Sequence, residues 1–213
     1  MTDLGDRFPA ILDQAAGGDQ DAFALLWTST HPMLLRYLRV ICGAQAEDVA
    51  SETWLKAIRA LGGFHGDEQG FRGWLVVIAR NLVRDQARHQ ARRPETLSGD
   101  LPYDYADRGA GHGMGQEPDT ADVAVERLST RAALRLVAGL PPGQAEMVAL
   151  RVVIGLDVAD VATIVGRSSG AVRVAVHRGL RTLAARLAAT PDEGADEPPV
   201  TQERARALIN RDA

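Results

Sequence analysis

The sequence predicts an all-α protein made of two helical modules joined by a flexible linker. Three observations predict this architecture. Apolar residues, 46% of the 213, recur mainly at steps of three and four, the period of an amphipathic helix. Aromatic residues, which favour strands, amount to only 5%. Between residues 95 and 122 the apolar period disappears, and so long a structureless run is typical of a segment between domains.

The first module is expected over residues 21–93, after a short lead-in of residues 1–20. Asp19 or Asp21 could cap its first helix, because a side-chain carboxylate accepts hydrogen bonds from the free N–H groups of a helix start. Pro32 is expected to interrupt that helix before a second apolar series begins, because proline has no backbone N–H.

Two further amphipathic helices complete the first module. We expect the earlier one to bury residues spaced three and four apart: Val49, Thr53, Trp54, Ala57, Ile58 and Leu61. Gly62 and Gly63 then end this helix and open a loop that runs to Gly70. The later helix is expected to bury Phe71, Trp74, Leu75, Ile78 and Leu82, and Pro94 ends the module.

The second module, expected over residues 126–189, contains the pattern of a helix-turn-helix. A short apolar helix is followed by Gly166 as the turn residue, and Ser168 is placed to cap the next helix. That next helix is expected to bury one stripe, formed by Val172, Val176, Leu180, Leu183 and Leu187. Its polar candidates for contact with DNA are Ser168, Ser169, Arg173, His177, Arg178 and Arg181.

The net charge of −4 conceals a strong partition along the chain. Residues 72–93 contain six arginines and one acid, and residues 166–187 contain five arginines and no acid. An acidic linker (94–125) separates these two basic segments, and an acidic tail (190–213) follows the second. Basic patches of this kind are typical of proteins that bind nucleic acid, although an arginine stripe is also found on ordinary solvated helix faces.

The first module carries an acidic face as well. Asp48 and Glu52 lie one helical turn apart with Ser51 between them, opposite the expected core stripe. Acids near a helix start are favoured by the helix dipole, so this face is either simply solvated or a docking surface for a basic partner. The residues alone leave both interpretations open.

The later helix of the first module presents a basic ladder, Arg80, Arg84, Arg88 and Arg92, with Asn81 beside it. Phe64, in the preceding loop, is an aromatic side chain close to this ladder. Unpaired bases stack on such aromatics, so Phe64 is either a stacking platform or a packed residue of the core.

These residues resemble two conserved regions of bacterial RNA polymerase sigma factors, and in particular the extracytoplasmic-function group. The segments similar to the second region run from Glu47 to Trp54, from Phe71 to Leu75 and from Ile78 to Arg88. Those similar to the fourth region run from Leu140 to Arg151, from Gly155 to Ala162 and from Gly166 to Leu180. Ser51 departs from the family, in which glutamine is common at this position.

The resemblance implies a protein that binds core RNA polymerase and promoter DNA, with an anti-sigma factor as a further partner. It places polymerase binding on Asp48, Ser51 and Glu52. It places recognition of the −10 element on Phe64, Arg80, Asn81, Arg84 and Arg88. It places recognition of the −35 element in the major groove on the polar candidates of the second module, and the linker in the RNA exit path of the polymerase.

Two other classes of function compete with this one. A stand-alone helix-turn-helix regulator would dimerise and bind palindromic sites without polymerase. An enzyme is not expected, because the five histidines lack metal-ligand spacing and no glycine-rich phosphate loop with a lysine is present. We therefore expect neither a metal nor a cofactor.

The single cysteine, Cys42, cannot form an internal disulfide, and no positively charged leader precedes an apolar run. The longest purely apolar stretch, residues 75–79, is too short to cross a bilayer. The sequence thus predicts a cytoplasmic protein with no membrane insertion.

Overall fold

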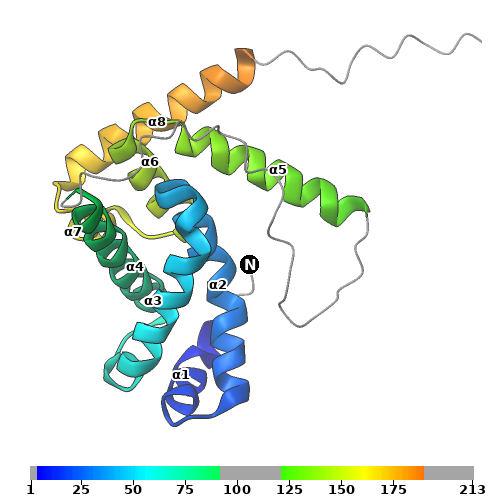
Figure 1. Cartoon of the computed structure of the whole chain (residues 1–213), viewed down its shortest axis with the longest axis vertical. Helices are drawn as coiled ribbons and strands as arrows, with labels where there is room; N and C mark the ends of the chain where they lie inside the picture. The colour runs from blue at the N-terminus through cyan, green and yellow to red at the C-terminus, as the bar shows by residue number, and fades with distance from the viewer. Residues whose placement is uncertain (1–3, 92–120, 190–213) are drawn as a thin grey trace, which may run out of the picture.

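The computed structural model describes residues 4–91 and 121–189, and both segments are helical (Figure 1). The predicted all-α class is confirmed, since neither described segment contains a strand. The helices are α1 (Phe8–Ala16), α2 (Gln20–Cys42), α3 (Ala46–Ala60), α4 (Glu68–Ala91), α5 (Ala121–Ala138), α6 (Pro142–Val148), α7 (Val158–Val165) and α8 (Ser169–Ala189). The acidic tail and residues 94–120 of the acidic linker lie outside the described residues.

Shorter helical turns join several of these helices. Three are 3₁₀ turns, namely η1 (Gly5–Arg7), η2 (Gly43–Gln45) and η3 (Leu61–Gly63). The fourth, η4 (Ala149–Ile154), is a π-helical turn that continues α6 and ends at Gly155, whose φ of 83° is left-handed. Glycine adopts this conformation without the steric cost that a Cβ imposes, so it ends the helix there.

Helix α2 lies at the centre of the molecule. It contacts α1, α3 and α4 of the first module, and also α5, α6 and η4 of the second. Its start is capped by Asp19, whose Oδ1 accepts a hydrogen bond of 2.8 Å from the backbone N of Ala22. Asp19 is therefore the cap, and Asp21 is an exposed residue of the first turn.

The expected interruption of α2 at Pro32 is wrong, because the helix runs through this residue without a break. Pro32 lies on the exposed side, so the carbonyl group of Thr28 that lacks its usual N–H partner faces the solvent. On the opposite side, Met33, Leu34 and Tyr37 are buried. Tertiary packing of that face outweighs the local cost of the proline.

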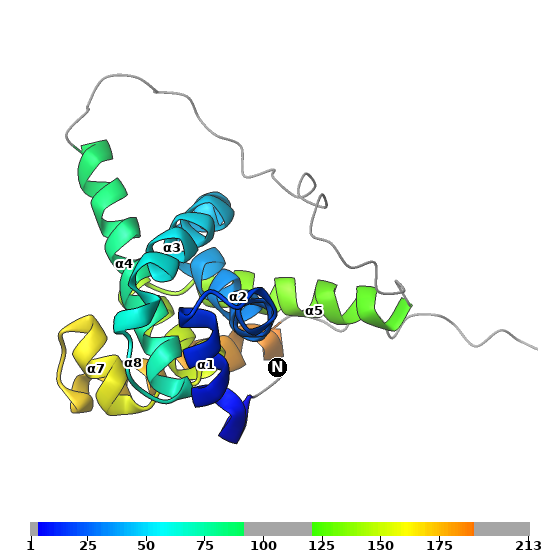
Figure 2. The ribbon, with the colours of Figure 1, turned by 90° about the horizontal axis from the view of Figure 1, so that it is seen from below.

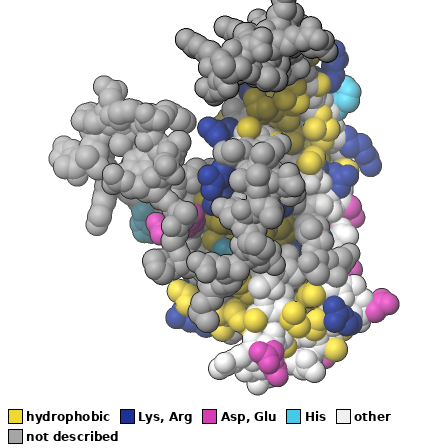
Figure 3. Space-filling model, turned by 90° about the vertical axis from the view of Figure 1, so that its right-hand side faces the viewer, with side chains coloured by type: hydrophobic (Ala, Val, Ile, Leu, Met, Phe, Trp, Pro, Cys, Tyr) yellow, Lys and Arg dark blue, Asp and Glu magenta, His cyan; other side chains and the backbone are white. Residues whose placement is uncertain are grey.

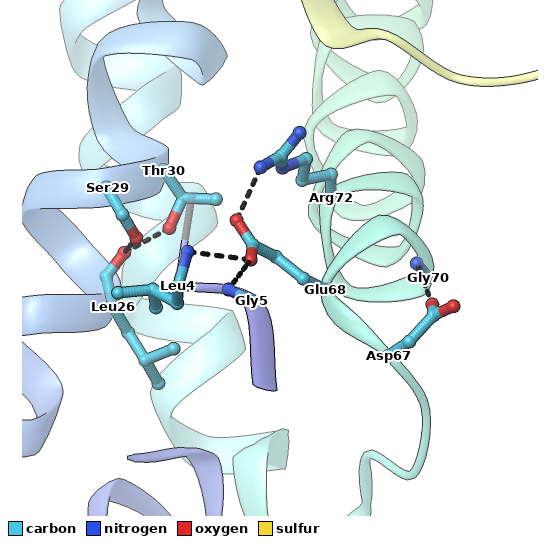
Figure 4. A network of polar contacts seen from close by, with 9 residues as sticks. All are labelled: Leu4, Gly5, Leu26, Ser29, Thr30, Asp67, Glu68, Gly70 and Arg72. Atoms are coloured by element: carbon cyan, nitrogen blue, oxygen red, sulfur yellow. Dashed lines mark hydrogen bonds and ion pairs between the residues drawn. The ribbon is translucent and has the colours of Figure 1, made fainter. Parts of the chain in front are cut away.

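The segment expected as a lead-in forms the packed helix α1. Phe8, Ile11, Leu12 and Ala15 are buried against α2 and η3, and their spacing of three, one and three is that of an amphipathic helix. The carboxylate of Glu68, at the start of α4, holds this end of the chain in place. Its Oε2 accepts hydrogen bonds from the backbone N of Leu4 (2.9 Å) and of Gly5 (3.2 Å), while Oε1 pairs with Arg72 (Figure 4).

The two modules share one core in this structure. Leu34, Leu38 and Leu75 from the first module belong to the same cluster of buried residues as Leu150 and Ile154 from the second. Helix α4 lies beside α7, and α2 lies beside α5, as the two views agree (Figures 1 and 2). The helix-turn-helix is therefore seated directly on the first module.

Glycine is required at one position of α8. A Cβ at Gly179 would lie 2.7 Å from Cγ2 of Val148 and 3.3 Å from Cδ1 of Leu140, both in the buried core of the second module. Such contacts force neighbouring groups to move, so α8 packs closely against α6 at Gly179.

We expect Gly179→Ala to lower the free energy of unfolding by about 1–3 kcal/mol, because overpacking outweighs the ~1 kcal/mol that alanine gains in helix propensity. Denaturant unfolding followed by circular dichroism measures this change. Gly170→Ala is the matched control in the same helix, since a Cβ there meets nothing within 4 Å and should cost no stability. Equal stability of the two variants would contradict the close approach.

Candidate nucleic-acid interface

The α7–turn–α8 unit has the geometry of a helix-turn-helix. Oδ1 of Asp157 caps α7 by accepting a hydrogen bond of 2.7 Å from the backbone N of Asp160. The turn is Gly166 at a left-handed φ of 69°, and Oγ of Ser168 then caps α8 by accepting a hydrogen bond of 3.2 Å from the backbone N of Ala171. The predicted turn residue and the predicted cap are both confirmed.

The outward side of α8 is basic. Arg173, His177, Arg178 and Arg181 are all exposed, and within the described part of the chain none of these arginines forms an ion pair. In Figure 3 several Lys or Arg side chains and a histidine lie along the upper right, at the height where Figure 1 places α8, and the acids lie lower down together with a few further basic side chains. This face is open to a polyanion, because no carboxylate of the described residues neutralises it.

The apolar stripe predicted for α8 is only partly buried. Val172 is fully buried, and Val176 and Leu183 are half-buried. Leu180 and Leu187 are exposed, by 45% and 60%, so their predicted burial is wrong. The reason is the rotation of the helix: Gly179, rather than Leu180, faces α6, and the last turns of α8 extend past the core.

Arg92 of the predicted ladder lies outside the described residues, and the rest of the ladder divides into two parts. Asn81, Arg84 and Arg88 are exposed, and Arg88 makes an exposed ion pair of 3.3 Å with Asp85. Such an exposed pair stabilises the fold little and leaves the guanidinium available to other anions. Arg80, by contrast, is turned inward.

Arg80 binds a carboxylate from the second module. Its Nε lies 2.6 Å from Oε1 of Glu146 in α6, and its Nη2 lies 3.4 Å from Oε2. The hydroxyl of Tyr37, a buried residue of α2, donates to the same Oε1 over 3.4 Å. The side chain of Arg80 is only 13% exposed, and the hydrogen bond to Glu146 raises its pKa.

Neither Glu146 nor Tyr37 was found by sequence reasoning. Tyr37 stands in an apolar run and Glu146 in a short helix, and no local spacing marks either one. The packing of α2, α4 and α6 brings Tyr37 and Glu146 together, although these residues lie 109 positions apart along the chain.

Phe64 is half-buried in an aromatic cluster. Its ring centroid lies 5.4 Å from that of Phe71 and 5.2 Å from that of Trp74, and Phe8 of α1 completes the group. The predicted contact of Phe64 with a base stays a prediction. In this structure the ring contributes to the core through an edge-to-face contact with Phe71 and a tilted contact with Trp74.

The acidic face of α3 lies on the surface as predicted from its spacing. Asp48 and Ser51 are exposed, and Glu52 is half-buried with its carboxylate 3.6 Å from the ammonium of Lys56. Leu55, which is 57% exposed, continues this face by one turn. Ile58 was expected in the core, but it is 49% exposed, because Ala57 rather than Ile58 faces α2 and α4.

A histidine connects α3 to α2. Trp54 Nε1–H of α3 donates a hydrogen bond of 3.2 Å to Nδ1 of His31, and the ring of Trp27 stacks on the imidazole at 4.4 Å. Nδ1 must be unprotonated to accept this bond. Burial, and then the positive charge of Arg39, lower the pKa of His31, while Glu47 opposes them.

Within residues 4–91 and 121–189, no group of three or more His, Cys, Asp or Glu side chains is arranged to hold a metal ion. None of the helices that the structure describes is both long and apolar enough to cross a bilayer.

Two family models of known proteins match this chain, one in each module. Residues 26–93 match the family model of sigma-70 region 2, and residues 130–183 match that of sigma-70 region 4. The first match spans α3 and α4, and the second spans the helix-turn-helix.

Two similar proteins and one solved structure cover most of the chain. The ECF RNA polymerase sigma factor BldN of Streptomyces coelicolor is 36% identical over 88% of this chain and 67% of its own length. The ECF RNA polymerase sigma factor SigD of Mycobacterium tuberculosis is 32% identical over 90% of this chain and 89% of its own length. The sigma factor RpoE of Bartonella quintana, solved with the anti-sigma factor NepR, has a similar fold, with a TM-score of 0.57, 22% identity and coverage of 78% of this chain and 97% of that one.

The contact of His31 predicts a pH dependence. The pKa of His31 is lower in the folded than in the unfolded protein. The contribution of His31 to stability is therefore complete above the pKa of the unfolded protein, and it is lost as the pH falls toward the pKa of the folded protein. We expect His31→Gln to reduce the loss of stability between about pH 7 and pH 5, as measured by urea unfolding. His65→Gln, at an exposed histidine, is the control and should leave the loss unchanged. A profile for His31→Gln that equals the wild-type profile would contradict this role.

Proposed function

Because the chain belongs to the extracytoplasmic-function group of the sigma-70 family of RNA polymerase sigma factors, we propose that it binds core RNA polymerase and directs transcription initiation at specific promoters. The observation that carries this proposal is the presence of both sigma regions, in order, in one chain. A stand-alone helix-turn-helix regulator is not favoured, since it would not need region 2.

For the −35 element we propose recognition by α8 in the major groove. Arg173, His177, Arg178 and Arg181 point away from the core, and Ser168 and Ser169 lie at the end of the helix that usually meets the bases. An arginine that binds a guanine through two hydrogen bonds contributes about 1–3 kcal/mol of discrimination. The exposed, unpaired arginines support this assignment.

For the −10 element we propose recognition by α4 and the loop before it. Asn81, Arg84 and Arg88 are exposed and suited to contact phosphates and bases of an opened strand. Arg80 and Phe64 would join them only after a change of partners, since Arg80 binds Glu146 and Phe64 packs against Phe71.

For the polymerase we propose docking on the acidic face of α3, formed by Asp48, Ser51 and Glu52. The exposed side chain of Leu55 lies on the same face and adds apolar area to it. An acidic rim with an apolar centre is typical of protein interfaces that recognise a basic partner.

An anti-sigma factor is proposed as a third partner, in line with membership of this family. We further propose that the protein acts in the cytoplasm, where polymerase is found, and has no enzymatic activity of its own. The donors on α4 and α8 serve binding, and catalysis belongs to the polymerase.

Two substitutions separate the proposed roles. We expect Arg173→Ala to lower promoter-specific transcription about tenfold to a hundredfold, through lost contacts with DNA, while the affinity for core polymerase is unchanged. We expect Asp48→Ala to weaken binding to core polymerase. Pull-down with core polymerase and transcription in vitro measure the two effects.

The matched controls are Arg131→Ala, at an exposed arginine of α5 in the same module, and Asp13→Ala, at an exposed acid of α1. Both should behave as the wild type in both assays. If the purified chain does not bind core polymerase but binds an operator tightly by itself, the proposed function is wrong and the chain is a stand-alone helix-turn-helix regulator.

A further inference from the structure

We propose that the N-terminal segment, residues 4–16, is a positioning element for the loop of residues 64–67, and that Glu68 holds this loop in the shape that discriminates between bases of the −10 element. The proposal rests on the proposed function, which assigns −10 recognition to α4 and to the loop before it. Glu68 is a positioning residue, because its carboxylate contacts the protein backbone and acts on DNA only through the loop.

The carboxylate of Glu68 is a clamp between the start of α4 and the first residues that the structure describes. Its Oε2 accepts hydrogen bonds from the backbone N of Leu4 and of Gly5, which lie 64 and 63 positions away along the chain, and its Oε1 pairs with Arg72 (Figure 4). The side chain of Glu68 is only 11% exposed. Charge-assisted hydrogen bonds of this kind are roughly twice as strong as bonds between neutral groups, so Glu68 fixes the N-terminal segment against α4.

The loop of residues 64–67 is fixed at both of its ends. At its start, the backbone N of Phe64 donates a hydrogen bond of 3.0 Å to the carbonyl O of Leu61 in η3. At its end, Oδ1 of Asp67 accepts a hydrogen bond of 2.7 Å from the backbone N of Gly70 in the first turn of α4. The carboxylates of Asp67 and Glu68 point in opposite directions, one toward α4 itself and the other toward the N-terminal segment (Figure 4).

The loop also folds around its own aromatic ring. A Cβ at Gly66 would lie 3.0 Å from Cζ of Phe64, and a Cβ at Gly70 would lie 3.8 Å from the same atom. The ring of Phe64 therefore anchors the loop, while residues 65–67 are exposed and present their polar groups outward. These exposed groups are the part of the loop that we infer contacts the −10 element.

The N-terminal segment contacts every anchor of this loop. Helix α1 contacts η3, which precedes the loop. Phe8 of α1 is 1% exposed, and its ring centroid lies 5.7 Å from that of Phe71, the ring on which Phe64 packs at 5.4 Å. Glu68, directly after the loop, binds the backbone ahead of α1. The shape of the loop thus depends on a segment that is far from it in the sequence.

A fixed loop favours selectivity. When its donors and acceptors are held in place before DNA binds, a wrong base leaves some of them unpaired, and the loop cannot rearrange to satisfy them. A looser loop adapts to several bases and loses more conformational entropy on binding each of them. Release of the clamp should therefore reduce discrimination between bases at the −10 element and leave the −35 element unaffected.

Glu68→Gln tests the clamp in the full-length chain bound to core polymerase. The one amide oxygen of glutamine can face the backbone N–H groups or Arg72, and its NH₂ group is then a donor that meets a donor on the other side. Transcription in vitro from a promoter library with randomised −10 and −35 positions, read by sequencing the transcripts, measures discrimination at each position. We expect −10 discrimination to fall about fivefold to tenfold, with −35 discrimination and affinity for core polymerase unchanged.

Asp19→Ala is the matched control, since it also removes a carboxylate that accepts a hydrogen bond from a backbone N at a helix start, here that of Ala22. It should lower stability in urea unfolding and leave −10 discrimination at the wild-type value. An equal loss of −10 discrimination in the two variants would overturn the positioning role, because the loss would then follow from lower stability alone.

A double-mutant cycle with Phe64→Ala tests whether Glu68 acts through the loop. Phe64→Ala removes the anchoring ring, so the double variant should discriminate between −10 bases no worse than Phe64→Ala by itself. If the two losses multiply, Glu68 acts by another route and the proposal is wrong.

Amide hydrogen exchange of the free chain, measured by NMR, reports on the clamp without DNA. The amides of Leu4 and Gly5 should exchange about tenfold faster in Glu68→Gln than in the wild type. Unchanged exchange would overturn the clamp. If circular dichroism shows that Glu68→Gln has lost helicity, Glu68→Asp replaces it, because the shorter side chain keeps the charge and withdraws its oxygens from the N–H groups; it should reproduce both effects.

Failure of the proposed function has a different signature from failure of this proposal. If α4 and its loop do not recognise the −10 element, the wild-type chain itself shows no discrimination at the −10 positions. If only the positioning role is wrong, the wild-type chain discriminates and Glu68→Gln discriminates equally well.

Discussion

The meeting of Glu146, Arg80 and Tyr37 is the interaction on which the arrangement of the two modules depends. One carboxylate from α6 binds donors from α2 and α4, in a place where apolar side chains exclude most of the water. A half-buried guanidinium needs such a partner, because an unpaired charge there is costly. Without this carboxylate, α4 would meet α6 with an unpaired cation, and the shared core of the two modules would be harder to form.

The faces proposed to bind DNA and polymerase depend on the division of each helix into a buried and an exposed side. Val172 and Gly179 hold α8 against the core, and this leaves Arg173 and its neighbours outside. Thr53 and Ala57 hold α3 in the same way, with Asp48 outside. A sigma factor must recognise DNA and polymerase with different surfaces. Amphipathic helices provide one basic and one acidic surface, and no loop has to become ordered to form either of them.

Local features of the sequence predicted much of this structure. Ser168 and Gly166 were assigned their roles from capping and turn chemistry, which acts over a few residues and needs no tertiary partner. The same chemistry gave Asp19 and Asp21 as alternative caps of α2, and the structure shows that Asp19 is the cap. The errors have a common cause. Packing against distant helices outweighs local preference at Pro32 and in the lead-in that forms α1. Packing also sets which side of α3 is buried, and it leaves Ile58 exposed.

By itself, the sequence predicted the helix-turn-helix with its cap and turn, most of the other helices, the basic and acidic faces and the membership of the family, because these depend on residue types at short spacing. Only the tertiary structure decided that the two modules lie together, that Arg80 faces inward and that Glu146 is its partner. The physical reason is distance along the chain: the pair joins residues 66 positions apart, and no periodicity carries information over that separation. Two arginines of one ladder, Arg80 and Arg84, look alike in the sequence and differ only in what the fold puts next to them.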